Sequence, residues 1–182
     1  MRYLLAPVPQ NYNYLNINAI MPAIITGVVA IVGFLVQIII NLYTQYQNKR
    51  ANKINTLNTF LIPLQKMLME ISTQMKFANL TLENLVLCVI GVESCSENIR
   101  VKSISIYQEI SLLFLKGNYY YIDRKVHKYI TKIRKHTYNV ISILESSNLP
   151  ENKMKEIIGE ISIKESDYNN LISYIDELQK KM

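Results

Sequence analysis

Residues 19–40 form an uncharged, almost wholly apolar run, AIMPAIITGVVAIVGFLVQIII. As an α-helix, 22 residues would extend about 33 Å, which matches the roughly 30 Å thickness of a bilayer's hydrocarbon core. The run therefore predicts a helix that crosses a membrane once. The alternative is a helix in the core of a soluble domain, but buried helices rarely reach this length without a charged residue.

The residues on either side of the run support the membrane interpretation. Tyr12 and Tyr14 precede it and Tyr43 and Tyr46 follow it, where aromatic rings would lie near the lipid headgroups. A cleaved signal peptide has an apolar core of only about 7–15 residues and ends at a small-x-small site, which this chain lacks. We expect the span to stay attached to the rest of the chain.

Positive charges predict the orientation of the span. Lys49, Arg50 and Lys53 follow it closely, whereas Arg2 and the amino terminus are the only cations before it. Under the positive-inside rule, the N-terminal tail lies outside and the C-terminal part is cytoplasmic. We expect Cys88 and Cys95 in that part to be reduced and buried, since no second Cys/His pair stands at zinc-ligand spacing.

Composition predicts an all-α protein. Hydrophobic residues make up 49% of the chain, with only 5 Gly and 5 Pro, so turn-forming residues are scarce. Pro63 removes a backbone donor and predicts a hinge at about residues 59–62. The expected organisation is a tail (1–18), a transmembrane helix (19–42), a helical stalk (43–62) and a cytoplasmic antiparallel bundle of about four helices (63–182).

A helix expected from about Leu64 has an amphipathic pattern that continues into the apolar stretch 85–90, which we interpret as a core helix. A further helix over about 104–114 precedes a turn at Gly117 and Asn118. The final helix, expected from Pro150 to the C-terminus, has apolar residues at alternating spacings of three and four. Its seam contains Ile161, Lys164, Tyr168, Leu171, Ile175 and Leu178. A polar residue such as Lys164 in a seam typically fixes register or partner number.

The helix expected over about 120–145 has one apolar and one basic face. Residues 116–135 contain seven Lys or Arg and one acid, a net charge of +6. Its apolar seam, of the kind found in coiled coils, contains Ile130, Ile133, Val140 and Leu144. Its basic face contains Arg124, Lys128, Lys132 and Lys135.

Three interpretations of the basic face remain open. The first is a solvated surface that aids solubility. The second is a contact for anionic lipid headgroups, and the third is a binding surface for a nucleotide or nucleic acid. The last is the weakest, because no nucleic-acid-binding motif accompanies the nearby tyrosines. His127 and His136 fall on different faces of this helix, so we interpret them as surface or interfacial residues and not as ligands of a shared metal.

Two features of the span predict self-association. Ala19, Ala23 and Gly27 are spaced by four, which lets two helix backbones approach closely. Gln37 is an amide that would seek a hydrogen-bond partner in lipid, which a neighbouring copy could supply. The alternative for Gln37 is that its side chain extends to the nearby membrane interface. We expect a homo-oligomer.

The sequence contains no Gly-rich phosphate loop and no hydrolase or metalloprotease signature. We predict a non-enzymatic protein, with no catalytic residues, no metal and no cofactor. The order of a short tail, one span, the basic Asn48-Lys49-Arg50 and a stalk ending in Phe60-Leu61-Ile62-Pro63-Leu64 resembles that of small bacterial single-span membrane proteins. Some of these are partner subunits or membrane-acting effectors of anti-phage and toxin systems.

This resemblance implies an inner-membrane protein that associates with itself or holds a protein partner at the cytoplasmic face. The alternative is a membrane receptor or scaffold whose basic helix (116–136) binds anionic lipid, nucleotide or nucleic acid. Membrane lipid is an expected contact under both hypotheses.

Overall fold

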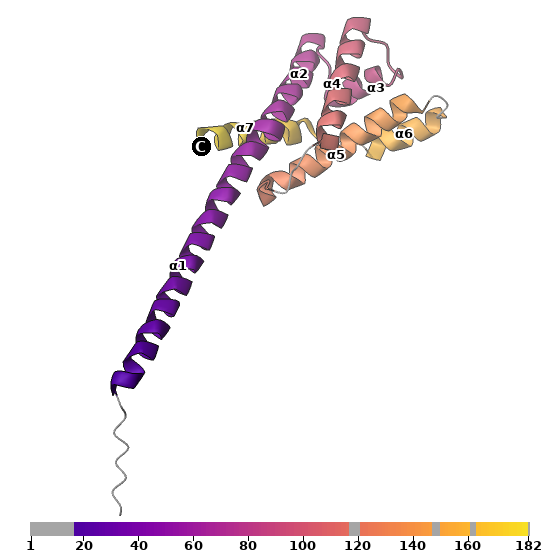
Figure 1. Ribbon diagram of the computed structural model, residues 1–182. Helices are drawn as coiled ribbons and strands as arrows, with labels where there is room; N and C mark the ends of the chain where they lie inside the picture. The colour runs from indigo at the N-terminus through magenta and orange to yellow at the C-terminus, as the bar shows by residue number, and fades with distance from the viewer. Residues whose placement is uncertain (1–16, 117–120, 147–149, 161–162, 182) are drawn as a thin grey trace, which may run out of the picture. The chain divides into compact units, whose positions relative to one another are not determined.

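The computed structural model describes residues 17–116, 121–146, 150–160 and 163–181 (Figure 1). Within these ranges all regular secondary structure is helical, which confirms the all-α prediction. The chain divides into two compact units, Met1–Asn48 and Lys49–Met182. The helices are α1 (Ile17–Thr56), the π-helical turn η1 (Leu57–Leu61), α2 (Ile62–Ala78), α3 (Leu82–Val89), α4 (Glu97–Lys116), α5 (Arg124–Glu145), α6 (Glu151–Glu160) and α7 (Glu165–Lys180).

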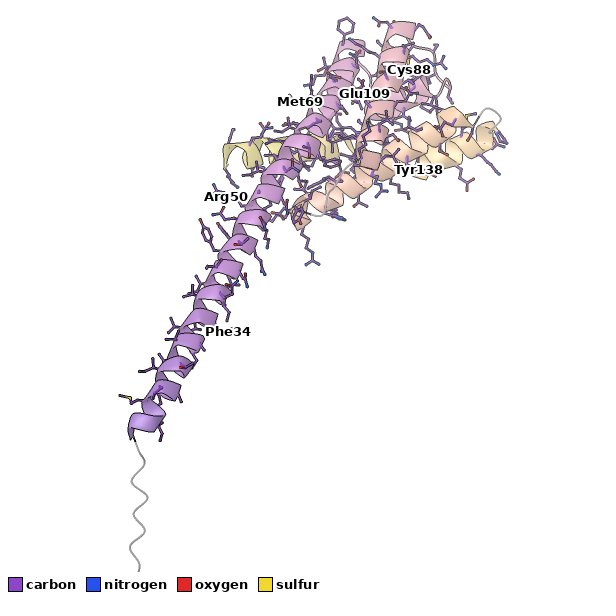
Figure 2. All side chains as sticks on the ribbon, viewed as in Figure 1. Phe34, Arg50, Met69, Cys88, Glu109 and Tyr138 are labelled. Atoms are coloured by element: carbon purple, nitrogen blue, oxygen red, sulfur yellow. A yellow bond between two sulfur atoms is a disulfide. The ribbon has the colours of Figure 1, made fainter. Side chains whose placement is uncertain are left out.

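The described part of the first unit is residues 17–48 of α1. Every large apolar side chain from Ile20 to Ile40 is 37–67% exposed, and Phe34 is the most exposed of them (Figure 2). Pro22 lies in the helix near its start, where the Thr26 hydroxyl donates a hydrogen bond to the Pro22 carbonyl at 2.8 Å. The structure thus has one helix long and apolar enough to cross a membrane.

A single π-helical turn, η1, separates α1 from α2 and ends two residues before Pro63. A proline in a helix has no N–H to donate and its ring crowds the carbonyl four residues earlier, at Thr59. Leu57, Phe60 and Leu61 of this turn are buried. The hinge predicted at Pro63 therefore coincides with an irregular turn, and its function as a hinge stays a prediction.

The helix expected to continue from Leu64 through the apolar stretch 85–90 is instead two helices. α2 ends because Asn79 adopts a left-handed conformation with φ 54°, and the Leu80 N–H donates to the Met75 carbonyl at 2.9 Å. Thr81 then caps α3, its hydroxyl oxygen accepting from the Asn84 N–H at 3.3 Å. The break needs no Gly or Pro, since Asn tolerates this conformation and Thr is a good N-cap.

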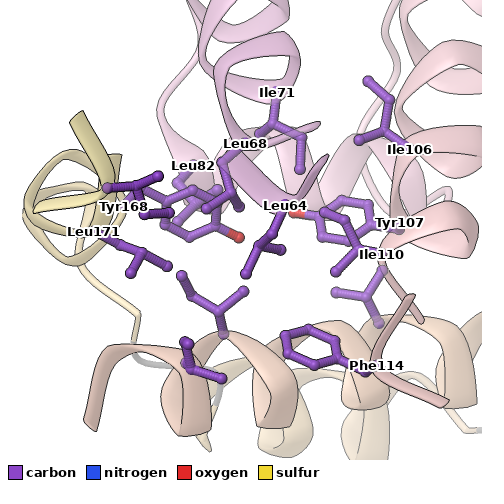
Figure 3. Packing of buried hydrophobic residues seen from close by; sticks show 14 of the residues in the cluster. Leu64, Leu68, Ile71, Leu82, Ile106, Tyr107, Ile110, Phe114, Tyr168 and Leu171 are labelled. Carbon is purple, nitrogen blue, oxygen red and sulfur yellow. The ribbon is translucent and has the colours of Figure 1, made fainter. Parts of the chain in front are cut away.

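The second unit contains one hydrophobic core. α2 contacts α4 and α7, and α5 contacts the same two helices; α3 contacts α4. Leu64, Leu68 and Ile71 of α2 face Tyr107 and Ile110 of α4 (Figure 3), and all five side chains are fully buried. The apolar stretch 85–90 belongs to this core, as predicted: the buried residues of α3 include Leu85, Val86, Cys88 and Val89.

α5 and α7 run antiparallel. The start of α5 contacts the later part of α7, and a residue further along α5 contacts the start of α7. The Tyr174 hydroxyl donates to Asp123, and Lys132 reaches Asp167. The predicted apolar residues Ile130, Ile133 and Val140 of α5 are buried, and Leu144 is partly buried. In α7, Tyr168, Leu171 and Ile175 are buried and Leu178 is partly buried.

The final helix is not continuous, contrary to the prediction from its seam. α6 ends at Glu160 and α7 begins at Glu165, with Lys164 in an extended conformation at the N-cap. Lys164 is exposed, so it is not a polar residue within a packing seam. The three-four spacing of apolar residues in the sequence continues across this break, so the spacing alone does not reveal it. Ile161, the first residue of the predicted seam, lies outside the described residues.

Candidate functional site

The exposed surface of α5 is strongly basic. Arg124, Lys128 and Lys135 are exposed along it, as the sequence pattern predicts, and Lys125 and Arg134 flank them. Asp123 is the N-cap residue of α5 and accepts a hydrogen bond from the Lys125 N–H at 3.1 Å. No acidic residue occupies the first turn of α5. Two cations therefore stand at the positive end of the helix dipole, where they do not favour helix stability.

Lys132 departs from the prediction that it belongs to this basic face. Its ammonium group lies 2.9 Å from the Asp167 carboxylate, and its side chain is 41% exposed. The Asp167 side chain is only 10% exposed. A buried carboxylate is stable only when it is paired or hydrogen-bonded. Lys132 therefore ties α5 to α7 and is not available as a free cation for a ligand.

A groove of about 380 Å³ lies between α5 and α7. One end is marked by Tyr174, whose hydroxyl donates to the Asp123 carboxylate at 2.9 Å. This bond and the one from the Lys125 N–H lower the pKa of Asp123, the backbone bond having the larger effect. Partial burial and the same carboxylate raise the pKa of Tyr174. The lining residues are Lys125, Lys128, Tyr129, Asn170, Ser173, Tyr174 and Glu177.

A second group of polar side chains lies inside the core. The Tyr107 hydroxyl is 3.0 Å from His136 Nε2, and the rings of His136 and Tyr168 meet edge to face with centroids 6.1 Å apart. Their exposed fractions are 0%, 2% and 3%. The expectation that His136 is a surface or interfacial residue is therefore wrong. A dissolved substrate cannot contact this trio, which argues for a structural role.

Burial determines the protonation states of the trio. It lowers the pKa of His136 to about 3, so the imidazole is neutral near pH 7. Burial also raises the pKa values of Tyr107 and Tyr168, so both phenols keep their protons. We infer that the Tyr107 hydroxyl donates to Nε2 and that the ring proton is on Nδ1, which has no hydrogen-bond partner among the described residues.

Cys88 and Cys95 form a disulfide, contrary to the expectation that both are reduced. Their Cα atoms are 5.8 Å apart, within the range that a disulfide requires. The chain between them turns at Gly91, whose φ of 82° favours glycine, and an added Cβ there would lie 3.3 Å from the Arg100 guanidinium. The turn after α3 thus brings the two cysteines together, which their spacing of seven residues does not reveal.

The other predicted site residues lie in α1. Ala23, Gly27 and Gln37 are exposed, and Gln37 Nε2 donates to the Asn41 side chain of the same helix at 3.4 Å. The side chain of Ala19 lies outside the described part. A separate groove between α2 and α4 contains Glu70 and Glu109, yet no group of three or more His, Cys, Asp or Glu in the described ranges is arranged to hold a metal ion.

Comparison with known proteins gives no match: no protein-family model, no curated protein and no solved structure resembles this chain closely enough to be identified as a relative.

Replacing Lys132 should destabilise the domain more than replacing the neighbouring Lys135. Lys132→Ala leaves the Asp167 carboxylate buried without its partner, which we expect to cost about 1–2 kcal/mol after allowance for the partial exposure of Lys132. Lys135→Ala removes an exposed side chain and should change stability by less than about 0.5 kcal/mol. Urea unfolding of the detergent-solubilised full chain measures both, and equal effects would contradict the distinction.

The stability of the domain should fall as the pH drops below about 6.5. Unfolded His136 titrates near its ordinary value of 6.5 and folded His136 near 3, so the unfolded state binds the extra proton between these values. The stabilisation is complete above pH 6.5 and decreases towards pH 3, by roughly 1.5 kcal/mol between pH 6.5 and 5. Tyr107 and Tyr168, which face the ring, stay protonated throughout. His136→Gln should flatten this slope in unfolding curves; an unchanged slope would contradict the assignment.

Proposed function

We propose that this chain is a single-span membrane protein that self-associates through α1 and acts by binding, without catalysis, through its helical domain. The observation that carries the proposal is the division of α1 into two unlike faces. In a helix with about 100° between successive residues, Ala23, Thr26, Gly27, Ala30 and Gln37 fall on one side. Phe34 is the bulky residue on that side. The opposite side contains Met21, Ile24, Ile25, Val28, Val32, Leu35, Val36 and Ile39.

This division suits a helix that meets lipid on one side and another helix on the other. Lipid tails are as apolar as leucine, so helices in a bilayer associate through close packing and polar contacts. Small side chains at Ala23, Gly27 and Ala30 permit close backbone approach. Gln37 and Asn41 lie on the same side, and the amide groups that their mutual hydrogen bond leaves unsatisfied can pair with a second copy. We infer a symmetric homo-oligomer with parallel spans.

The exposure of the apolar run supports the membrane assignment. Side chains from Ile20 to Ile40 would each cost free energy in water, about 1.5–3 kcal/mol for a large apolar side chain. A bilayer removes this cost. The same run with a charged or amphipathic pattern would suit a surface helix of a soluble protein; α1 has neither between these residues.

Binding is favoured over catalysis by what the described residues offer. The best-defined polar cluster, Tyr107 with His136 and Tyr168, is sealed in the core. At the surface the Thr131 hydroxyl lies 3.4 Å from His127 Nδ1, but it already donates to the His127 carbonyl at 2.8 Å within the same helix. We propose a bacterial inner-membrane interaction protein that holds copies of itself or a protein partner. An effector of a defence or toxin system that clusters its spans to perturb the bilayer is one version of this function.

A second candidate function is a receptor or scaffold whose basic helix binds an anionic molecule. It is favoured by the exposed cations Arg124, Lys128 and Lys135 of α5, which lie together without an acidic residue among them. The two candidate functions depend on different parts of the chain. The first depends on the small-residue face of α1 and the second on the positive charge of α5.

Gly27→Leu should weaken the oligomer. An added side chain at Gly27 meets nothing within 4 Å in the single chain, so the substitution leaves the monomer unstrained. Between two closely packed helices it would block contact, and we expect at least a fivefold loss of crosslinked oligomer in native membranes. Val28→Leu, on the opposite face, is the matched control and should change little. Crosslinking that yields only monomer for the unaltered chain would refute self-association.

The proposed orientation can be tested through the cysteine pair. We propose that Lys49, Arg50 and Lys53 keep the domain cytoplasmic. The Cys88–Cys95 disulfide of the structure would then be reduced to two thiols in cells, because cytoplasmic reductants break such bonds. Cells lysed in acid, denatured and treated with a maleimide polymer without reductant should then yield protein with both cysteines labelled. Protein that is labelled only after reduction contains the disulfide in cells, which would place the domain outside the cytoplasm.

A further inference from the structure

We propose that the groove between α5 and α7 is a binding site for a phosphate group. This inference concerns a site that the self-association of α1 neither requires nor predicts. The groove has a volume of about 380 Å³, enough for a phosphate with a small organic substituent. Both helices are labelled in Figure 1.

The cations of the groove supply the charge that a phosphate needs. Lys125 and Lys128 both line it, and neither side chain forms an ion pair with any residue in the described ranges. They differ in this from Lys132, one helical turn beyond Lys128, which is held by Asp167 at 2.9 Å. An ammonium group on a flexible stem is a common phosphate ligand because it can adjust its position to the anion.

Neutral groups in the same groove can complete the coordination. Tyr129 and Ser173 contribute hydroxyls and Asn170 contributes an amide, all of which can donate hydrogen bonds to phosphate oxygens. The groove is also held at both ends. The Tyr174–Asp123 hydrogen bond joins α5 to α7 on one side of it and the Lys132–Asp167 pair joins them on the other. A ligand would therefore meet a preformed site, which lowers the entropy cost of binding.

The first turn of α5 contains two cations, one of which, Lys125, interacts electrostatically with the Asp123 carboxylate. Arg124 and Lys125 lie in the first helical turn, where the helix dipole disfavours positive charge. The negative charge of a bound phosphate would instead interact favourably with this end of the helix dipole. Glu177 is the acidic residue among those that line the groove, and its carboxylate lies 3.8 Å from the Lys181 ammonium. Its charge opposes an anion, so its removal should strengthen binding.

The phosphate could belong to a lipid headgroup or to a soluble phosphate compound, and the recognition chemistry is shared. The test is isothermal titration calorimetry of the full chain in a neutral maltoside detergent at constant ionic strength. The soluble probes are inorganic phosphate and phenyl phosphate. The lipid probe is dihexanoyl phosphatidylglycerol below its micelle concentration, with dihexanoyl phosphatidylcholine for comparison and sodium chloride as the salt control.

We expect saturable binding of at least one phosphate probe, weakened about tenfold by Lys128→Glu or Lys125→Glu. Lys76→Glu is the control for charge reversal at an exposed cation of α2 outside the groove, and it should have a much smaller effect. Glu177→Gln should tighten binding. Lys128→Gln removes the cation without adding an acid, and thermal unfolding confirms that each variant is folded.

The probes that bind identify the source of the phosphate group. Binding of phenyl phosphate or inorganic phosphate indicates a soluble ligand, and binding confined to phosphatidylglycerol indicates a lipid headgroup. Both results support the site. Absence of saturable binding for every phosphate probe would overturn the proposal. So would an equal loss in Lys76→Glu and Lys128→Glu, which would indicate general attraction to a positively charged protein. The absence of tighter binding in Glu177→Gln would also overturn it.

Discussion

The hydrophobic effect on α1 is the constraint on which the rest of this account depends. Moving the exposed apolar side chains from Ile20 to Ile40 out of water and into lipid is worth on the order of 20 kcal/mol or more. Such a helix needs an apolar environment. A bilayer supplies one along the whole length of the run, and the helical conformation satisfies the backbone hydrogen bonds that lipid cannot.

The second unit shows how a small helical domain combines an apolar core with polar contacts of distinct kinds. Tyr107 and His136 are hydrogen-bonded inside the core, so the domain contains a titratable group whose neutral form the folded state favours. Lys132 and Asp167 form a partly buried tie between α5 and α7. Lys125 and Lys128, on the same helix, form no ion pair with the residues that the structure describes. The cation that joins two helices is thus distinct from those available to a ligand.

The sequence predicted the elements whose signals are local and strong. The apolar run, the core stretch 85–90 and the two-faced pattern of α5 all follow from hydrophobic periodicity, and each is present in the structure. Breaks set by single residues were missed. Asn79 ends α2 without the Gly or Pro that usually marks a helix end, and the interruption before Glu165 falls in a stretch whose apolar spacing is uninterrupted.

Pairings across the fold could not be predicted for a different reason. The partners Lys132 and Asp167 are 35 residues apart, and Tyr107 and His136 are 29 apart; helix periodicity places each on a face but does not say which faces meet. The groove between α5 and α7 depends on the same information. The cysteine pair shows the converse, since Cys88 and Cys95 are close in sequence but meet only because the turn at Gly91 reverses the chain.

The most direct test of the central claim is extraction of membranes from cells that express the full chain. If α1 spans the bilayer, the protein should remain in the pellet after washes with alkaline carbonate and with urea, and should enter solution only with detergent. Replacing Val28 and Val32 by Arg should release it, because two charges near the centre of the span oppose insertion. Recovery of the unaltered protein in the carbonate supernatant would contradict the account.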